Sequence, residues 1–368
     1  MENCRIMPLF YYIRKRFFRP DPLDRKGRDL RRTVLKRLLG LLLAVGIMMG
    51  GAATGEGTPG PAVPETPAPV RIARPEPEPT PEMPAVINCA ADPGADAGFH
   101  FPMDAELLHI WFPNIMNADE AILMYQGEVW LIDCGDEKMG ARGAELIGRL
   151  GISRIRKLFN THPHHDHLNG LRVTDQAAKV EELLICFGAA STEHMIRAVT
   201  YAEENGIRVA EFRDGSEFGM GDGAVSLKFW HNTDPYLDMN NQSAITMVRY
   251  GERTILFTAD AERSGQANLL SRVPAAELKA DLLKYPHHGK SPLDDDFLQA
   301  VSPDAAIVTN RTVPDWNGVK YLTAKGIPFI YTNQNDVYLH LVTDGQHWIA
   351  EQVPRDRVPA MTDEPGGT

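Results

Sequence analysis

The chain has 368 residues, of which 43% are hydrophobic and 24% are charged, and its formal net charge is −11. These proportions are ordinary for a globular protein. Residues 1–37 hold twelve Lys or Arg against four Asp or Glu, a local charge of +8, so the remaining residues carry −19. An acidic body repels polyphosphate unless a local patch or a metal ion overcomes the repulsion, which excludes a general nucleic-acid-binding protein.

An uncharged apolar run from Leu38 to Ala53 follows a basic segment, residues 1–37. This layout is typical of a signal peptide, with Gly51–Ala53 as a small-residue cleavage site, and Arg31–Lys36 resembles a twin-arginine export signal. The alternative is an uncleaved anchor, although sixteen residues are slightly short of the ~20 that a bilayer requires. Either way we expect an extracytoplasmic protein, secreted or held at the membrane by this segment.

Residues 54–98 form a proline-rich spacer that cannot build a core and favours extended polyproline conformations. We interpret it as a stalk or an inert linker. A hydrolase domain is expected over 99–355 and a disordered tail over 356–368. Of the four cysteines, Cys4 and Cys89 lie before the domain, and Cys134 and Cys186 are expected to be buried free thiols because no Cys-x-x-Cys spacing occurs.

The body alternates strand-like and helical segments. Strands are predicted at 106–112, 121–126, 128–133, 155–159, 182–187, 207–210, 224–231, 243–250, 252–258, 281–285, 304–309, 328–331, 336–342 and 346–352. Helices are predicted at 138–150, 191–205, 261–270, 293–300 and 315–325, and another opens near 168–171. Hairpins interspersed with helices predict an α/β fold in which two sheets lie between helical layers.

Residues 161–170 place four metal-capable side chains within six positions: His162, His164, Asp166 and His167. Imidazole and carboxylate groups are the usual ligands of zinc and comparable divalent ions. On a helix these side chains would fan out to different faces, and Pro163 lies inside the cluster. We therefore expect a loop at the end of a strand that turns all four toward one point.

The pattern His-x-His-x-Asp-His resembles the signature of the metallo-β-lactamase superfamily. Three further segments resemble other motifs of that family: Leu131–Gly135 with its Asp133, Leu256–Asp260, and Tyr285–Gly289. The resemblance covers about residues 105–350 and implies an αββα sandwich with the active site at the sheet edge.

Within the superfamily the chain most resembles the hydrolase domain of the competence protein ComEC and its free-standing relatives. Ile115–Met124, which contains Asp119, is similar to their opening strand, Asn240–Ser243 stands where they carry Asn-x-x-Ser, and His287–Ser291 is similar to their His-His-Gly-Ser run. The departures are Met116 for glycine, Asn117 for glutamine and Lys290 for serine, and they bear on substrate identity more than on the metal site.

The resemblance implies two divalent ions, Zn²⁺ or Mn²⁺. His162 and His164 would hold one ion, Asp166 and His167 the other together with His287 or His288, and Asp260 would bridge them. A water shared by two such ions loses a proton near neutral pH and becomes a nucleophile. Of His287 and His288, an extended strand end could turn only one inward, and we favour His287 as the ligand and His288 as a contact to substrate or ligand.

The histidine of the family's third motif has no clear counterpart. The candidates are His194, in a helical stretch, His231, at a strand end, and Asn241, which matches the family's asparagine and is favoured. An amide oxygen binds metal weakly and makes Mn²⁺ as plausible as Zn²⁺.

Six polar residues are expected around the ligands. Asp133 and Asp119 would orient ligands, since a carboxylate that accepts the second N–H of a ligating imidazole fixes its tautomer. Lys290 and Ser291 would hold a phosphoryl oxygen, or else Ser291 would open a helix before Pro292. Thr309 and Asn310 could add a polar contact.

These observations predict an exported metal-dependent hydrolase, most consistent with a phosphodiesterase or nuclease activity on a small-molecule or short phosphodiester substrate. Asp166, Asp260, Asn241 and Lys290 are the expected catalytic residues, and long nucleic acid is disfavoured by the acidic body. The alternatives are a β-lactam, lactone or thioester hydrolase of the same fold, and a non-enzymatic binding module displayed on the surface.

Overall fold

The computed structural model describes residues 87–88, 106–334 and 336–361. The predicted leader over 38–53, nearly all of the spacer over 54–98, and both Cys4 and Cys89 lie outside these ranges. Among the described helices, none combines the length and apolar character that crossing a bilayer would need.

The first sheet has nine strands within the described residues, in the order β1-β18-β17-β2-β3-β4-β6-β8-β9. They are β1 (Ile87–Asn88), β2 (Leu108–Phe112), β3 (Ala121–Tyr125), β4 (Glu128–Ile132), β6 (Lys157–Asn160), β8 (Glu182–Ile185), β9 (Arg208–Glu211), β17 (Val337–Thr343) and β18 (Trp348–Pro354). Strands β4, β6, β8 and β9 run parallel to one another, so their carboxyl ends share one edge of the sheet.

The second sheet has seven strands in the described part of the chain, in the order β10 to β16. They are β10 (Glu217–Met220), β11 (Val225–Trp230), β12 (Ile245–Tyr250), β13 (Arg253–Phe257), β14 (Leu282–Lys284), β15 (Ala305–Arg311) and β16 (Phe329–Asn333). The first four strands are antiparallel, and β13 to β16 are parallel. A separate two-stranded pair joins β5 (Arg154–Ile155) to β7 (Lys179–Val180).

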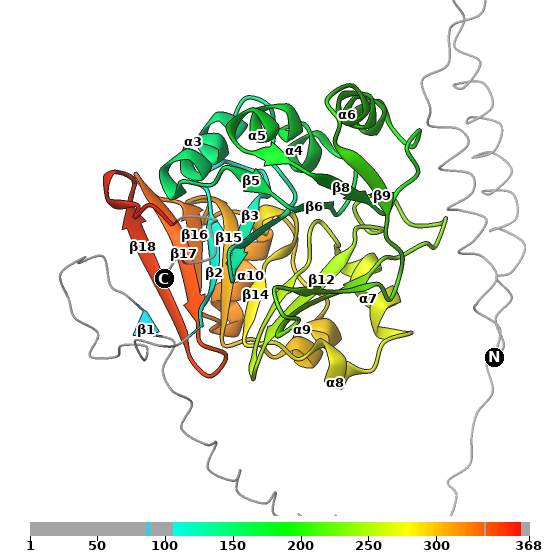
Figure 1. Cartoon of the computed structure of the whole chain (residues 1–368). Helices are drawn as coiled ribbons and strands as arrows, with labels where there is room; N and C mark the ends of the chain where they lie inside the picture. The colour runs from blue at the N-terminus through cyan, green and yellow to red at the C-terminus, as the bar shows by residue number, and fades with distance from the viewer. Residues whose placement is uncertain (1–86, 89–105, 335, 362–368) are drawn as a thin grey trace, which may run out of the picture. The chain divides into compact units, whose positions relative to one another are not determined.

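Helices cover the outer faces of both sheets (Figure 1). On the first sheet lie α3 (Gly140–Leu150), α4 (His165–Leu168), α5 (Leu171–Ala177) and α6 (Glu193–Glu204), and on the second lie α7 (Arg263–Leu270), α8 (Ala275–Leu278), α9 (Asp295–Val301) and α10 (Asn317–Lys325). Two short 3-10 turns are η1 (Pro286–Gly289) and η2 (Arg355–Arg357). Capping residues fix two of the helix ends. The Thr192 side chain accepts a hydrogen bond from the Met195 N–H at the start of α6, and Gly151 adopts a left-handed φ of 74° after α3.

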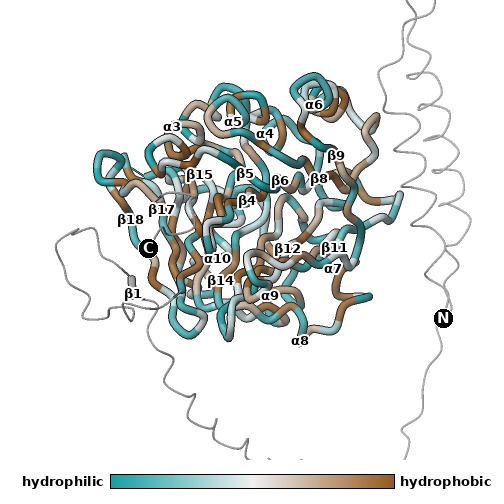
Figure 2. The backbone as a smooth tube through the Cα atoms, in the orientation of Figure 1, coloured by the Kyte–Doolittle hydropathy of each residue, from teal (hydrophilic) through white to brown (hydrophobic). Residues whose placement is uncertain are grey.

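Three apolar clusters fill the spaces between these layers, and the apolar segments lie in the interior (Figure 2). In β6, Phe159 belongs to the cluster between the sheets and Leu158 to the cluster under α3–α6, because successive strand residues face opposite sides. The ring of Phe159 lies 4.7 Å from that of Phe229 in the other sheet. Burial on both faces explains why the central strands read as nearly continuous apolar runs. The αββα sandwich implied by the resemblance is confirmed.

The short elements β7, β10 and α8 are among those not expected from the sequence. Each has two to four residues, which is too short for hydrophobic periodicity to reveal. Residues 356–361, which we assigned to a disordered tail, instead continue the domain, because the Met361 N–H donates to the Leu150 carbonyl at the end of α3. Cys134 and Cys186 are free thiols, the first buried and the second half-buried.

Candidate metal centre

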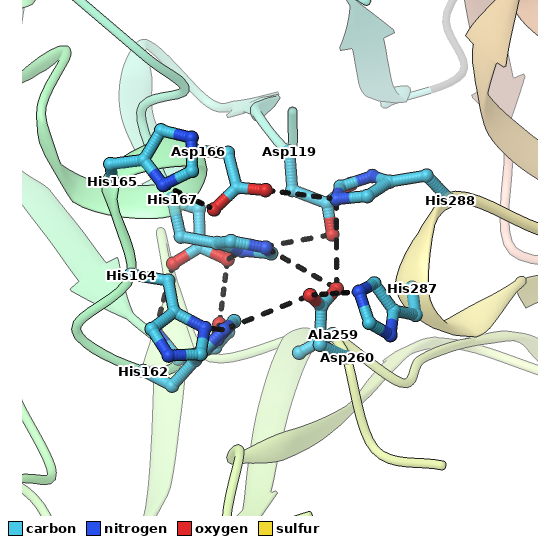
Figure 3. A network of polar contacts seen from close by, with 12 residues as sticks. Asp119, His162, His164, His165, Asp166, His167, Ala259, Asp260, His287 and His288 are labelled. Carbon is cyan, nitrogen blue, oxygen red and sulfur yellow. Dashed lines mark hydrogen bonds and ion pairs between the residues drawn. The ribbon is translucent and has the colours of Figure 1, made fainter. Parts of the chain in front are cut away.

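The carboxyl ends of four strands meet at one edge of the sandwich and bring chain-distant polar side chains together (Figure 3). Asp133 follows β4 and the 162–167 cluster follows β6, which is parallel to β4. Asp260 follows β13 and His288 follows β14, which is parallel to β13. The parallel pairing in each sheet places these residues at the same edge.

The first group of possible ligands consists of Asp166, His167, Asp260 and His288, whose donor atoms all lie within 4.8 Å of one another. His167 Nε2 is 3.3 Å from Asp260 Oδ1, and His288 Nε2 is 3.5 Å from Asp166 Oδ2. Two imidazoles and two carboxylates are a donor set that suits Zn²⁺ or Mn²⁺.

The second group consists of His162, His164 and Asp260. His162 Nε2 lies 3.8 Å from Asp260 Oδ2 and 3.0 Å from His164 Nδ1. Asp260 therefore directs Oδ1 toward the first group and Oδ2 toward the second, which is the placement that a bridging carboxylate requires.

Three donor atoms of the first group are buried and have no hydrogen-bond partner: His167 Nε2, Asp260 Oδ1 and His288 Nε2. Buried polar atoms are rarely left without a partner. Because all three face one another and are of the types that coordinate divalent cations, the residues present fit a metal ion.

Asp166 and His167 lie in a helical turn, which corrects our expectation of a loop throughout the cluster. The turn is α4, which begins at His165, and His164 before it is extended with φ −90° and ψ 158°. Pro163 therefore precedes the helix and does not interrupt it. The opposite side of the turn carries His165, whose side chain is 58% exposed.

His287 and His288 both reach the site, which corrects our expectation that only one could. Both residues have left-handed backbones, with φ of 48° and 55°, so the alternation of an extended strand does not apply. His288 is the one in the first donor group, whereas His287 Nε2 approaches Asp260 Oδ2 at 3.6 Å and the side chain is 14% exposed. His288 therefore lies among the donors of the first group, and which of the two histidines binds metal stays a prediction.

A carboxylate that the sequence did not single out, Glu262, holds His287 in place. Its Oε1 lies 2.8 Å from His287 Nδ1 and accepts a hydrogen bond from Ser291 Oγ at 2.6 Å. Lys290 Nζ lies 3.5 Å from His287 Nε2. The hydrogen bond from His287 lowers the pKa of Glu262. Lys290 and Ser291 are therefore arranged around His287, and their roles stay predictions.

Asp133 makes the contact that an orienting role requires. Its Oδ2 lies 2.7 Å from His167 Nδ1 and accepts a hydrogen bond from Thr161 Oγ1, while its Oδ1 accepts one from the Thr161 N–H. Burial raises the pKa of Asp133, although the charge of His167 opposes this. These bonds leave His167 Nε2 directed at the other donors, as the predicted role supposes.

Asp119 connects His288 to a buried lysine that was missed from the sequence. Its Oδ1 accepts a hydrogen bond from Thr309 Oγ1 at 2.6 Å and lies 3.2 Å from His288 Nδ1, while Oδ2 pairs with Lys284 Nζ. Burial alone would raise the pKa of Asp119, but the charges of Lys284 and His288 outweigh it and the pKa lies below its usual range. The available signal was a lone cation in the apolar strand β14, since lysine is rarely buried unless paired.

Asn241 does not face the donors, which corrects the choice of this residue as the amide ligand. Its Oδ1 accepts from the Gly265 N–H at 2.8 Å, and its Nδ2 donates to Asp238. The neighbouring Asn240 faces His164 instead, and its Oδ1 is buried without a hydrogen-bond partner. Of the other candidates, His194 bonds Asn169 and His231 packs on the Phe187 ring, and neither is in a donor group.

Burial lowers the pKa of the histidines in the site, whereas the neighbouring carboxylates raise it. Burial lowers the pKa of His162 well below its usual value, so this imidazole is neutral and able to bind a cation. In His288 burial also lowers the pKa, but Asp119 and Asp260 outweigh it and raise the pKa to about 9. A proton on His288 would have to leave when a cation binds, so metal affinity should fall with falling pH.

A family model and local sequence similarities connect this chain to known proteins. The family model described as the metallo-beta-lactamase superfamily matches residues 121–308. Zinc phosphodiesterase ELAC protein 1 of Homo sapiens is 41% identical over 54 residues, which are 15% of this chain and 14% of that protein. Ribonuclease Z of Acaryochloris marina is 34% identical over 79 residues, which are 21% of this chain and 24% of that protein. The chain therefore spans less than a quarter of the length of either relative.

A solved structure with a similar arrangement is the metallo-beta-lactamase fold protein YhfI from Bacillus subtilis. The match has a TM-score of 0.43 and 15% sequence identity, and it covers 61% of this chain and 95% of that one.

Proposed function

The chain belongs to the metallo-β-lactamase superfamily, and on that basis we propose that it hydrolyses phosphodiester bonds with two divalent ions held by the donors described above. It is a metal-dependent hydrolase of this fold. The observation that carries the finer proposal is the position of Asp260, whose two carboxylate oxygens face different donor groups.

When bound, two divalent cations would supply a water nucleophile near neutral pH and would stabilise the charge that develops on the phosphoryl oxygens. The chain's own residues would orient the groups that take part in this chemistry. Asp133 and Asp119 fix the Nδ1 side of His167 and His288, so that Nε2 of each faces the reaction centre. Lys290, beside His287 at the rim, supplies a cation within reach of a phosphoryl oxygen.

Two kinds of sequence similarity support a phosphodiester as the substrate rather than another compound. The local sequence matches are to a zinc phosphodiesterase and to ribonuclease Z, and the motifs at 115–124, 240–243 and 287–291 resemble the ComEC hydrolase domain. Because the chain after residue 37 carries a charge of −19, we propose a short substrate rather than long nucleic acid. The sequence of residues 31–53 supports the further proposal that the domain acts outside the cytoplasm.

The test is a substrate screen with the full chain loaded with Zn²⁺ or Mn²⁺. We expect turnover of bis(p-nitrophenyl) phosphate, its loss in Asp260→Ala, and its retention in the matched control Asp315→Ala, whose side chain is 95% exposed. Hydrolysis of a β-lactam, a lactone or a thioester without any phosphodiester turnover would overturn the substrate class. A chain that retains no transition metal and turns over none of these compounds would favour a binding module.

A further inference from the structure

A separate pocket of about 250 Å³ opens on the outer side of α4, between the α4–α5 segment and α6. Its residues do not belong to any of the donor groups. The floor is apolar and is formed by Leu168, Leu171 and Ala198. A floor of this kind accepts a planar ring, and the volume is suited to one small organic group.

Hydrogen-bonding side chains form the walls of this pocket: Asn169, His194 and Tyr201. They are held in position by their neighbours, because His194 Nδ1 lies 3.0 Å from Asn169 Oδ1 and the Tyr201 hydroxyl donates to Asp175 at 3.0 Å. Burial and the charge of Arg197 lower the pKa of His194, so the imidazole is neutral. A neutral imidazole, an amide and a phenol can recognise the polar edge of a heterocycle.

Two arginines, Arg172 and Arg197, and one carboxylate, Glu137, complete the lining. Arg172 pairs with Glu137 at 2.6 Å and Arg197 with Glu193 at 3.5 Å, and both arginine side chains are more than half exposed. Exposed ion pairs of this kind are weak, so a phosphate group can displace these carboxylates. Guanidinium groups bind phosphate in a bidentate manner.

The pocket adjoins the metal centre through His165. The His165 ring lies 6.0 Å from the His194 ring in the pocket, and its Nδ1 lies 3.6 Å from Asp166 Oδ1 in the first donor group. His165 is 58% exposed and contacts residues of both sites. The two sites are therefore close enough for one elongated substrate to contact both.

We propose that this pocket binds a nucleoside monophosphate unit, with the base on the apolar floor and the phosphate at Arg172 and Arg197. It would hold the nucleotide next to the bond being cleaved, and that part of the inference rests on the proposed phosphodiesterase function. Nucleotide binding itself needs neither metal nor turnover, so the two proposals can fail separately.

The test is calorimetric titration of the full chain with adenosine 5′-monophosphate in EDTA, which keeps the metal donors from binding the phosphate. We expect binding in the millimolar range or tighter, weakened at least tenfold in the double variant Arg172→Ala/Arg197→Ala. The matched control is Arg213→Ala, an arginine 86% exposed and outside the pocket, which should change the affinity less than twofold.

Equal binding by the double variant and the native chain, or no binding up to 10 mM, would overturn the pocket assignment. Inorganic phosphate that binds as tightly as the nucleotide would overturn the role of the base. If the nucleotide binds as expected while no phosphodiester is hydrolysed with metal present, the pocket stands and the proposed function of the donor cluster falls.

Discussion

Lys284 and Asp119 form a buried ion pair that joins the two sheets beside the metal centre. Lys284 ends β14 of the second sheet and Asp119 precedes β3 of the first, and the two residues are 2% and 5% exposed. Lys284 Nζ also donates to the Ala259 carbonyl at 3.1 Å, next to Asp260. The pair therefore connects Asp119, which contacts His288, to the backbone next to Asp260.

Removing one partner of this pair should destabilise the fold strongly. Lys284→Met leaves the buried Asp119 with only histidine ion-pair partners, His288 and His167, and breaking a buried pair typically costs ~3–5 kcal/mol. Adding Asp119→Asn should recover part of the loss. The measurement is urea unfolding of the metal-free chain. Lys325→Met, which removes an exposed pair with Asp295, is the control and should cost less than ~1 kcal/mol. Equal losses at the two sites would contradict this account.

Glu120 should make stability depend on pH. It is 2% exposed, both its oxygens lack hydrogen-bond partners, and burial raises its pKa to about 8. The folded chain therefore holds a proton that the unfolded chain releases near pH 4.5, so stability is lost as pH rises from about 4.5 to 8. A shift of this size corresponds to roughly 5 kcal/mol, at ~1.4 kcal/mol per pH unit.

Glu120→Gln mimics the protonated acid, so it should match the native chain at pH 4.5 and exceed its stability by several kcal/mol at pH 8.5. Glutamine also keeps the close packing at Gly143, where an added Cβ would meet Glu120 Oε2 at 2.2 Å. Unfolding free energies of both metal-free chains across this pH range provide the check, and parallel curves would refute the assignment.

The two neighbouring histidines should separate metal binding from turnover. His288→Ala removes a donor of the first group and should lower metal content, as should His162→Ala in the second group. His287→Ala should keep the metal content and lower turnover at least tenfold, because this side chain lies at the rim beside Lys290. Elemental analysis after dialysis, together with phosphodiester kinetics, distinguishes them. Metal loss in His287→Ala equal to that in His288→Ala would restore His287 as a ligand.

The adjacent asparagines should also behave differently. Asn240→Ala removes an amide that faces His164, so metal affinity should fall while stability changes little. Asn241→Ala leaves the buried Gly265 N–H without an acceptor, which costs ~1–3 kcal/mol in stability and should spare the metal. Metal titration and urea unfolding of both variants are the measurements, and the reverse pattern would show that Asn241 is the ligand.

Most strands and helices were predictable from the sequence because both sheets are buried on two faces, which gives each central strand an apolar run. The cluster at 162–167, together with the resemblance of the segments around Asp133, Asp260 and 285–289 to family motifs, predicted the site, although His287 was favoured over His288. Local backbone geometry was not predictable: the left-handed corner at 287–288 falls on two histidines, and the flanking Pro286 and Gly289 do not by themselves require a positive φ at either of them. Lys284 and Glu262 were missed because their contacts with Asp119 and His287 form only in the folded chain.

The donors come from two distant stretches of the chain, 162–167 and 260–288, and Asp260 is common to both groups. During translation the first stretch leaves the ribosome about a hundred residues before the second. A nascent chain, or a fragment cut between them, therefore offers incomplete coordination to any ion it meets. Stable loading has to wait until both stretches have been made and folded, so retention of metal through dialysis would report that the chain had been assembled through residue 288.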